Sequence, residues 1–309
     1  MTYRIANDEV SQNDWAVKEF RATVYFPVNC KNTCPFCTSR ALYNTWSPNP
    51  EAVIKALDLF VGLRPPKRPV VTITGGEPSY DLGMLAKMLD KLTDCDVYLN
   101  TTGLKANLED FSKVVLSYAG LVKGVSISRH TALWQTDRSI LRNIATDQQL
   151  ADVFKETNIR INAVIDDRTP KDRLQFIPDR WLPIYRARDG YLDVSLRYDY
   201  NKVTQENLHL LDTPIIRKLT DIPFLEYEGH SFCDVCDNLN FLYKGDMPVR
   251  FHRGLANTRL NLGNITSIES LVIFHDGLVA TDWDRTVDGL DWYLKQMDGY
   301  RIRRRKDRK

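Results

Sequence analysis

The sequence predicts an α/β fold, namely a partial (β/α)6 relative of the TIM-like barrel followed by a smaller C-terminal α+β extension. Two observations support this prediction. Six short β-branched runs alternate with amphipathic helical patterns, which is typical of βαβ units and a parallel sheet. After roughly residue 225, strand-like pieces follow one another without a regular helix between them. We therefore expect a barrel unit with an N-terminal lead-in over residues 1–225. An extension over 226–309 is expected to cover the barrel mouth and end in a basic tail.

The elements of the barrel unit follow from hydrophobic period and turn residues. The six expected strands are Ala22–Phe26, Val70–Thr74, Asp96–Asn100, Val122–Ser128, Ile159–Ile165 and Tyr191–Tyr198. Five helices are expected at Pro50–Leu63, Leu82–Leu92, Asn107–Tyr118, Thr146–Thr157 and Asp172–Tyr185, and a last one at Thr286–Met297. Barrels of this kind place their site at the carboxyl ends of the strands, so polar residues there are candidates.

Composition narrows the class of protein. The chain has 309 residues, of which 43% are hydrophobic and 27% charged, with a formal net charge of +2. No overall field favours a nucleic acid or a membrane, and no apolar run is long enough to span a bilayer. No apolar leader follows the polar N-terminal residues, so a cytoplasmic protein is expected. The basic residues 301–309 are either a solvated tail or a grip on an anionic substrate, so nucleic acid stays open as a partner.

Three cysteines lie just beyond the first expected strand, at Cys30, Cys34 and Cys37. In an intracellular chain such cysteines are more often metal ligands or core residues than disulfides. Three thiolates at these spacings suit a [4Fe-4S] cluster and leave one iron without a protein ligand. That iron can chelate the amino and carboxylate groups of S-adenosylmethionine. A zinc site completed by a fourth ligand is the alternative, but the position after a first parallel strand favours the cluster.

These cysteines, the later Gly75-Gly76-Glu77-Pro78 and the six βα units together resemble the radical S-adenosylmethionine (radical SAM) superfamily over about residues 20–225. The resemblance implies an iron-sulfur cluster that reductively cleaves S-adenosylmethionine. The resulting 5′-deoxyadenosyl radical abstracts a hydrogen atom from a substrate. An electron donor such as flavodoxin or ferredoxin is implied as a partner. In this family Phe36 packs near the adenine, and the loop from Gly75 to Pro78 contacts the methionine amino group.

Polar side chains at later strand ends complete the expected cofactor site. They are Thr102 after the third strand, Ser128 and Arg129 at the fourth, and Asn162 in the fifth. The resemblance implies that Ser128 and Asn162 bind the ribose or the methionine carboxylate. Arg129 would neutralise that carboxylate or a substrate anion. The alternative is that these residues only cap strands, and that Glu77 orients its loop by hydrogen bonds.

A second pair, Cys233 and Cys236, lies in a segment similar to the C-terminal cluster segment of the molybdenum-cofactor cyclase branch. That branch supplies a third cysteine, which is lacking here. Three interpretations stay open: a zinc site with His230 and a further ligand such as His252, an auxiliary iron-sulfur cluster with a non-cysteine ligand, or a turn with two reduced thiols. Cys95 stands alone and is expected to be a small buried hydrophobe.

The leading hypothesis is therefore a radical SAM enzyme acting on a small molecule, a nucleotide or a peptide. Basic residues after the barrel unit, such as Arg250, Arg253 and Arg259, favour an anionic or nucleoside-type substrate. The alternatives are a peptide-modifying radical SAM maturase and a non-catalytic cluster- or zinc-binding protein on the same scaffold. The sequence names neither the substrate nor a catalytic side chain.

Overall fold

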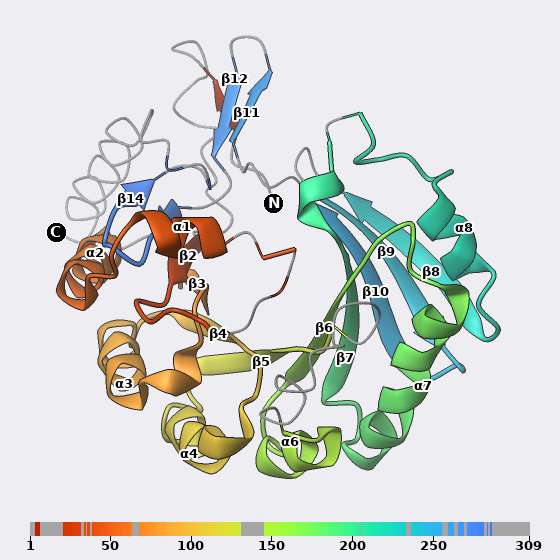
Figure 1. Ribbon diagram of the computed structural model, residues 1–309, viewed down its shortest axis with the longest axis horizontal. Coiled ribbons are helices and arrows are strands. Elements are labelled where there is room, and N and C mark those ends of the chain that lie inside the picture. Colours follow the sequence, from red (N-terminus) through yellow and green to blue (C-terminus); the bar gives the residue numbers. More distant parts are fainter. Residues whose placement is uncertain are drawn as a thin grey trace, which may run out of the picture.

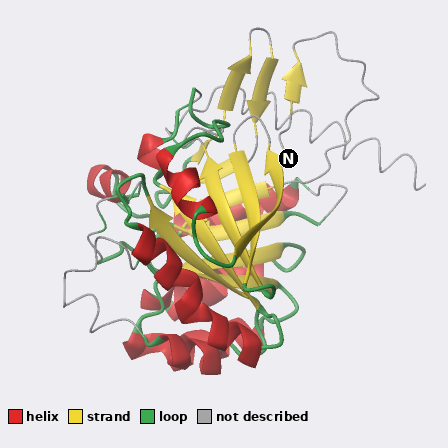
Figure 2. Ribbon diagram, turned by 90° about the vertical axis from the view of Figure 1, so that its right-hand side faces the viewer, coloured by secondary structure: helices red, strands yellow, loops and turns green. Residues whose placement is uncertain are grey.

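The fold consists of two sheets and an outer layer of helices (Figure 1). The computed structural model describes residues 4–6, 21–31, 34, 36–37, 39–63, 68–130, 145–204, 206–232, 236–254, 259–262, 265–268, 271–280, 283 and 285. The larger sheet has 11 strands in the order β14-β13-β2-β3-β4-β5-β6-β7-β10-β9-β8. The smaller sheet contains β1 (Arg4–Ala6), β12 (Ile265–Ile268) and β11 (Arg259–Leu262) in that order. Figure 2 shows this smaller sheet standing apart from the helices.

Parallel strands form the centre of the larger sheet and confirm the six expected strands to within one residue at each end. They are β2 (Arg21–Tyr25), β3 (Val70–Thr74), β4 (Asp96–Thr101), β5 (Val122–Ser128), β6 (Ile159–Ile165) and β7 (Leu192–Tyr198). Each pairs in parallel with the next. All their carboxyl ends therefore meet at one edge, where polar side chains from separate units come together.

The α-helices, apart from the short α1 near the end of β2, lie along the outer side of the curved sheet (Figure 1). They are α1 (Arg40–Thr45), α2 (Pro50–Gly62), α3 (Leu82–Lys91), α4 (Leu108–Ser117), α6 (Asp147–Val153), α7 (Lys171–Ala187) and α8 (Pro214–Thr220). The five helices expected in the barrel unit are confirmed as α2, α3, α4, α6 and α7. In α2, Asn49 accepts from the Ala52 amide at 3.1 Å and Pro50 occupies the first turn, where its missing N–H has no cost. No helix in the described ranges is long and apolar enough to cross a membrane.

The larger sheet is open, so the α/β class is confirmed but closure into a barrel is not. Beyond β7, strand β10 (Met247–Gly254) adds in parallel, and then β9 (Cys236–Tyr243) and β8 (Leu225–Phe232) add in antiparallel fashion. At the other edge, β13 (Leu271–Ile273) pairs in parallel with β2 and antiparallel with β14 (Val279–Ala280). Strands from the expected extension thus continue both edges of the same sheet.

Four expectations concern the C-terminal part. The division at residue 225 and the covering of the mouth by the extension stay predictions. The helix expected at Thr286–Met297 and the basic tail lie outside the described residues.

Side chains along each strand point alternately to the two faces of the larger sheet. One face packs against the helices in the core, and the other is the concave face. On β3, for example, Val71 and Ile73 are fully buried, and they belong to the single large apolar cluster that includes residues of the helices. Thr72 and Thr74 therefore point to the other side, since neighbouring strand residues face opposite ways. On β3 the concave face thus carries the polar residues and the opposite face the buried apolar ones.

Candidate functional site

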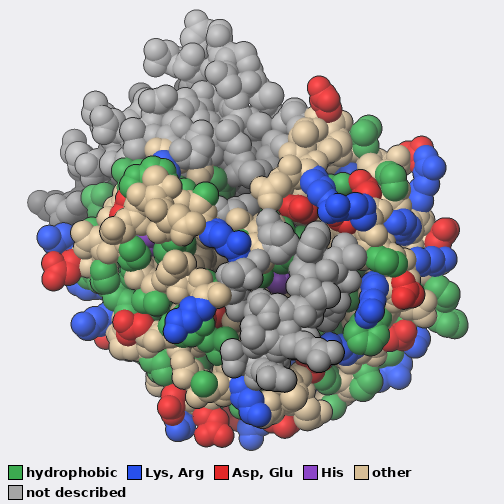
Figure 3. Space-filling model, viewed as in Figure 1, with side chains coloured by type: hydrophobic (Ala, Val, Ile, Leu, Met, Phe, Trp, Pro, Cys, Tyr) green, Lys and Arg blue, Asp and Glu red, His purple; other side chains and the backbone are tan. Residues whose placement is uncertain are grey.

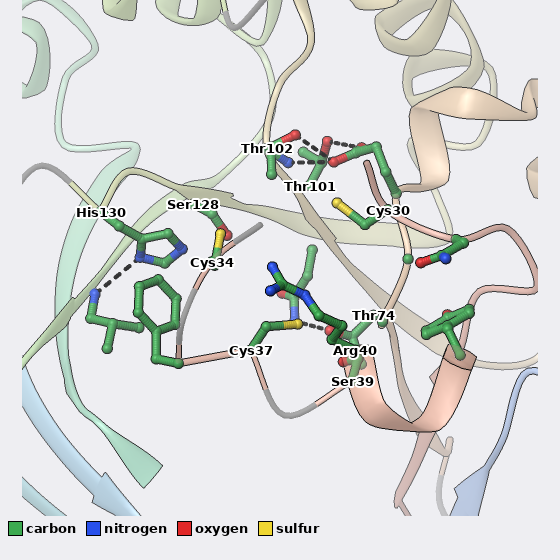
Figure 4. Close-up of a pocket in the computed structure, with 18 of the residues that line it drawn as sticks. Cys30, Cys34, Cys37, Ser39, Arg40, Thr74, Thr101, Thr102, Ser128 and His130 are labelled. Carbon is green, nitrogen blue, oxygen red and sulfur yellow. Dashed lines mark hydrogen bonds between the residues drawn. The ribbon is translucent and has the colours of Figure 1, made fainter. Parts of the chain in front are cut away.

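A pocket opens at the carboxyl ends of the central strands, where the cysteine loop, the double-glycine loop and the later strand ends meet (Figure 4). Nine of the residues singled out in the sequence line it: Cys30, Cys34, Phe36, Cys37, Gly75, Gly76, Glu77, Thr102 and Ser128. Pro78, Arg129 and Asn162 are not among the lining residues. The three parts of the sequence that carry the family resemblance therefore come together in one place.

The cysteine loop leaves β2 and crosses the mouth of the pocket. Within it, the Cys37 amide donates to the Cys34 carbonyl at 3.1 Å, which forms a tight turn. None of these three cysteines is in a disulfide. Burial, and then the neighbouring Cys37, raise the pKa of the Cys34 thiol, while the Arg40 guanidinium lowers it. Arg40 is thus the one nearby charge that favours a thiolate at Cys34.

Cys30, Cys34 and Cys37 are the candidate ligands of an iron-sulfur cluster. In the described part of the chain, no three His, Cys, Asp or Glu side chains are grouped so that they could hold one metal ion. A cubic cluster makes a different demand, because each thiolate binds a different iron and the sulfur atoms stay apart. Cys30, Cys34 and Cys37 lie at separate points of one pocket lining. This arrangement suits three corners of such a cluster, with the interior of the pocket left for a ligand.

Gly75 and Gly76 are required by the packing of the protein itself. Gly75 has a φ of 72°, and a Cβ there would lie 2.3 Å from Tyr25 Cδ1. A Cβ on Gly76 would lie 1.7 Å from the Val28 carbonyl oxygen. Since any side chain at these positions would collide, the glycines let the β3 loop lie directly against the segment that leads into Cys30. Their predicted contact with the methionine amino group stays a prediction.

Glu77 ties the double-glycine loop to the end of β4. Its side chain is 1% exposed, and both carboxylate oxygens accept hydrogen bonds. Oε1 accepts from the Ser79 amide at 3.2 Å, the Ser79 hydroxyl at 2.9 Å and the Thr101 hydroxyl at 2.5 Å. Oε2 accepts from the Thr102 amide at 2.8 Å and the Thr102 hydroxyl at 2.6 Å (dashed lines, Figure 4). The carboxylate is therefore occupied by the protein, in agreement with the loop-orienting interpretation of Glu77.

Arg129 continues this network away from the pocket. Its Nη1 donates to the carbonyl oxygens of Thr102 at 2.5 Å and Ser128 at 2.9 Å, and its Nη2 donates to that of Ala145 at 3.0 Å. Burial lowers the pKa of this guanidinium to about 10, although Asp147 raises it. The contacts place Arg129 as a positioning residue that fixes two strand ends. Its role toward a cofactor carboxylate stays a prediction.

Ser128 and Asn162 lie side by side on β5 and β6, where they are register partners. Ser128 lines the pocket, whereas Asn162 lies behind it and is buried. The Asn162 Oδ1 atom is buried without a hydrogen-bond partner. Buried polar atoms are nearly always satisfied, so this oxygen marks a place where a bound donor would lower the energy. A ribose hydroxyl, as the resemblance implies, is such a donor.

Phe36 and His130 form an aromatic wall of the pocket. Their ring centroids lie 4.5 Å apart in an edge-to-face arrangement. His130 Nδ1 accepts from the Val164 amide at 3.1 Å, so the proton of the neutral ring resides on Nε2. Burial, and then Arg129, lower the pKa of His130 to about 3. The ring is therefore neutral near pH 7 and offers Nε2–H as a donor beside Phe36.

Several lining residues were not predicted as site residues. Arg40 and Tyr43 come from α1, which at six residues is too short to show a helical period. Asp199 and Tyr200 directly follow β7, and the rule that sites lie at strand ends could have identified them. Tyr43 donates from its hydroxyl to the Phe26 carbonyl at 2.5 Å, which fixes α1 against the end of β2.

In the second cysteine pair, Cys236 belongs to β9, two strands beyond β7, where it is the register partner of Gly254 on β10. Cys236 begins β9, and Cys233 lies outside the described residues. The expected additional ligands lie on opposite faces of the sheet, because the register pairs His230 with Leu239 and His252 with Asn238. His230 contacts Asp237, and His252 contacts Asn238. One zinc ion therefore cannot bind both histidines in this arrangement, and the other interpretations of this pair stay predictions.

Comparison with known proteins gives matches among solved structures but none among family models or curated sequences. Among solved structures, native anSMEcpe with bound AdoMet is similar at a TM-score of 0.42 and 15% identity, covering 58% of this chain and 50% of that chain. The same protein with bound AdoMet and a Cp18Cys peptide gives a TM-score of 0.40 and 14% identity, with 58% and 50% covered.

A second kind of structure matches over a similar length. The flavin-binding domain of baker's yeast flavocytochrome b2 has a TM-score of 0.27 and 12% identity, covering 56% of this chain and 51% of that chain. The chain thus spans about half the length of the solved structures that it matches. Similarity at this level assigns neither a family nor a function.

Proposed function

We propose that this chain is a radical SAM enzyme in which Cys30, Cys34 and Cys37 hold a [4Fe-4S] cluster. The observation that carries the proposal is that these three thiols share one pocket with Gly75, Gly76 and the ends of the parallel strands. When bound, the cluster supplies the electron that cleaves S-adenosylmethionine into methionine and a 5′-deoxyadenosyl radical, which abstracts a hydrogen atom from the substrate. The family resemblance and the open side of a three-cysteine site support this assignment.

The residues of the chain bind and orient the cofactor in this proposal. Arg40 beside the cysteines attracts anionic groups, including the methionine carboxylate. Phe36 and the neutral His130 ring provide an apolar wall with one N–H donor for the adenosine. Asn162 Oδ1, which has no hydrogen-bond partner among the described residues, is the acceptor proposed for a ribose hydroxyl. Glu77 and Arg129 hold the loops that position these groups.

The proposed partners follow from this chemistry. An electron donor such as flavodoxin or ferredoxin reduces the cluster, and the substrate is a small molecule, a nucleotide or a peptide. A peptide-modifying maturase would use the same pocket, and no contact within the described residues favours it over the other substrates. The cytoplasm, where thiols stay reduced, is the proposed location.

Anaerobic reconstitution with iron and sulfide, followed by reduction in the presence of S-adenosylmethionine, tests the proposal. Wild type is expected to hold about four irons per chain and to form 5′-deoxyadenosine. Cys34→Ala is expected to lose both. Cys95→Ala is the matched control, because Cys95 is a fully buried cysteine outside the pocket. A wild type with full cluster content and no cleavage product from S-adenosylmethionine would overturn the proposal.

A further inference from the structure

Basic side chains gather on the concave face of β6, β7 and β10. The strand register places Arg250 opposite Ser195 and His252 opposite Arg197 on the β7–β10 pair. On the β6–β7 pair, Arg160 lies opposite Asp193. Three arginines and a histidine thus come from three neighbouring strands, although the sequence separates them by up to 92 positions.

The pattern of burial shows on which face these side chains lie. Val194 and Leu196 on β7, and Val249 and Phe251 on β10, are buried in the large apolar cluster. Because side chains alternate along a strand, Arg197, Arg250 and His252 project from the opposite, concave face. Here they share the side of the sheet that leads to the pocket.

Within the described residues, two of the three guanidiniums make no ion pair. Arg160 is neutralised by Asp193, to which its Nε and Nη2 donate at 2.8–3.0 Å. Arg197 donates to the Tyr200 hydroxyl at 2.6 Å, and its buried Nε atom has no partner. Arg250 donates to the Asn240 side-chain oxygen at 3.3 Å. In the described ranges, neither Arg197 nor Arg250 makes an ion pair.

The directions of the pKa shifts agree with this grouping of basic side chains. Partial burial, and then Arg160, lower the pKa of Arg250, and Arg197 adds to this effect, against Asp193, which raises it. Burial, and then Arg197, Arg250 and Arg160, lower the pKa of His252 well below its ordinary value. His252 is therefore neutral, and its Nδ1 donates to Asn238 at 2.8 Å. Holding like charges together has a cost that an anionic ligand removes.

Tyr200 connects this basic face with the pocket. It lines the pocket, its hydroxyl accepts from Arg197, and its ring centroid lies 6.1 Å from that of His252. Val164, also in the pocket lining, is the register partner of Arg197 on β6. Elsewhere, acidic and basic side chains are interspersed along the helical rim of the face seen in Figure 3.

The geometry allows both guanidiniums to bind one group. Neighbouring strands lie about 4.8 Å apart, and residues two apart on a strand are separated by about 6.6 Å, so the Cα atoms of Arg197 and Arg250 are about 8 Å apart. Two long arginine side chains at this spacing can converge on a single oxyanion. Two uncompensated positive charges match the dianionic charge of a phosphate monoester, and the guanidinium fork suits its oxygens.

We propose that Arg197 and Arg250 bind a phosphate group of the substrate, and that this group anchors the substrate beside the pocket. This inference rests on the enzymatic function proposed above. Tyr200, held by Arg197, sets the border between the anchored group and the reacting end of the molecule. The substrate class is accordingly a phosphorylated small molecule or nucleotide.

Calorimetric titration of the reconstituted full-length protein with inorganic phosphate tests this proposal. We expect phosphate to bind to wild type and to bind at least tenfold more weakly to Arg250→Gln and to Arg197→Gln. Arg250 is an exposed side chain with one hydrogen bond, so its substitution leaves the fold intact. Arg186→Gln is the matched control, because Arg186 is exposed and pairs only with Asp246 in the described ranges; its affinity for phosphate is expected to equal that of wild type.

Two results of the phosphate titration would contradict the proposal. Equal phosphate affinity in wild type and Arg250→Gln, or no phosphate binding by wild type, would overturn the proposal. Titration with acetate is the second arm, and acetate binding that matches phosphate would assign the site to carboxylates instead. Formation of 5′-deoxyadenosine is measured on the same wild-type sample. Phosphate binding without this product would reject the proposed function alone, and the product without phosphate binding would reject the anchor alone.

Discussion

The Glu77 carboxylate is predicted to be the largest single polar contribution to the stability of the pocket. Its five hydrogen bonds come from Ser79, Thr101 and Thr102, and two of the donors are backbone amides. In Glu77→Gln one carboxylate oxygen becomes an NH2 group, so at least one of these amides faces a donor instead of an acceptor. A buried N–H without an acceptor costs about 1–3 kcal/mol, and hydrogen bonds that lose a charged acceptor weaken by about 1 kcal/mol each. We therefore expect the free energy of unfolding to fall by about 2–5 kcal/mol.

Equilibrium unfolding in urea, followed by circular dichroism, measures this change. Glu156→Gln is the control, because Glu156 is exposed and is expected to change the free energy of unfolding by less than about 0.5 kcal/mol. If Glu77→Gln lay as close to wild type as the control does, the assignment of Glu77 as the residue that holds the loop would be wrong.

Three further predictions concern other parts of the chain. Gly76→Ala should destabilise the protein by more than about 3 kcal/mol or prevent folding, because its Cβ would meet a backbone carbonyl oxygen at 1.7 Å. Gly62→Ala, in α2 with nothing within 4 Å, should instead stabilise it by about 0.5–1 kcal/mol in the same urea titration. Burial would raise the pKa of Asp166, but hydrogen bonds from Lys202 and a neighbouring arginine lower it overall. Its carboxylate therefore stabilises the fold above its unfolded pKa of about 3.9, and this contribution is lost as the pH falls further. The stability difference between wild type and Asp166→Asn should accordingly shrink from pH 6 to pH 3, and a constant difference would contradict the ion pairs. Cys236→Ala should keep about four irons per chain by colorimetric iron analysis, whereas a loss of iron would place Cys236 at a cluster.

The central strands could be predicted because each one is specified by residues that are neighbours in the sequence. A β-branched run such as Val70–Thr74, ended by two glycines, specifies both a strand and its end. The cysteine spacing and the double-glycine loop are equally local, and their meeting in one pocket follows from parallel strands that end at the same edge. This part of the site was therefore accessible from the sequence.

Other parts depend on contacts between distant segments. The guanidinium of Arg129 donates to three backbone carbonyl groups, whose positions no sequence pattern reveals, and its expected role toward a cofactor or substrate anion stays a prediction. The pairing of β10 with β7 is likewise set by tertiary packing, so the basic cluster around Arg250 was visible only as scattered charges. The sequence predicted a partial, open relative of the barrel, but it did not reveal that strands of the extension continue both edges of the sheet, because that pairing depends on tertiary packing.

The claim that Cys30, Cys34 and Cys37 leave one iron open to S-adenosylmethionine is tested most directly by electron paramagnetic resonance of the reduced, reconstituted protein. Spectra are recorded with and without S-adenosylmethionine at equal cluster content. The account predicts a [4Fe-4S]⁺ signal whose g values shift when S-adenosylmethionine is added, because the cofactor coordinates the iron that lacks a cysteine. A signal that is identical in both samples would contradict it.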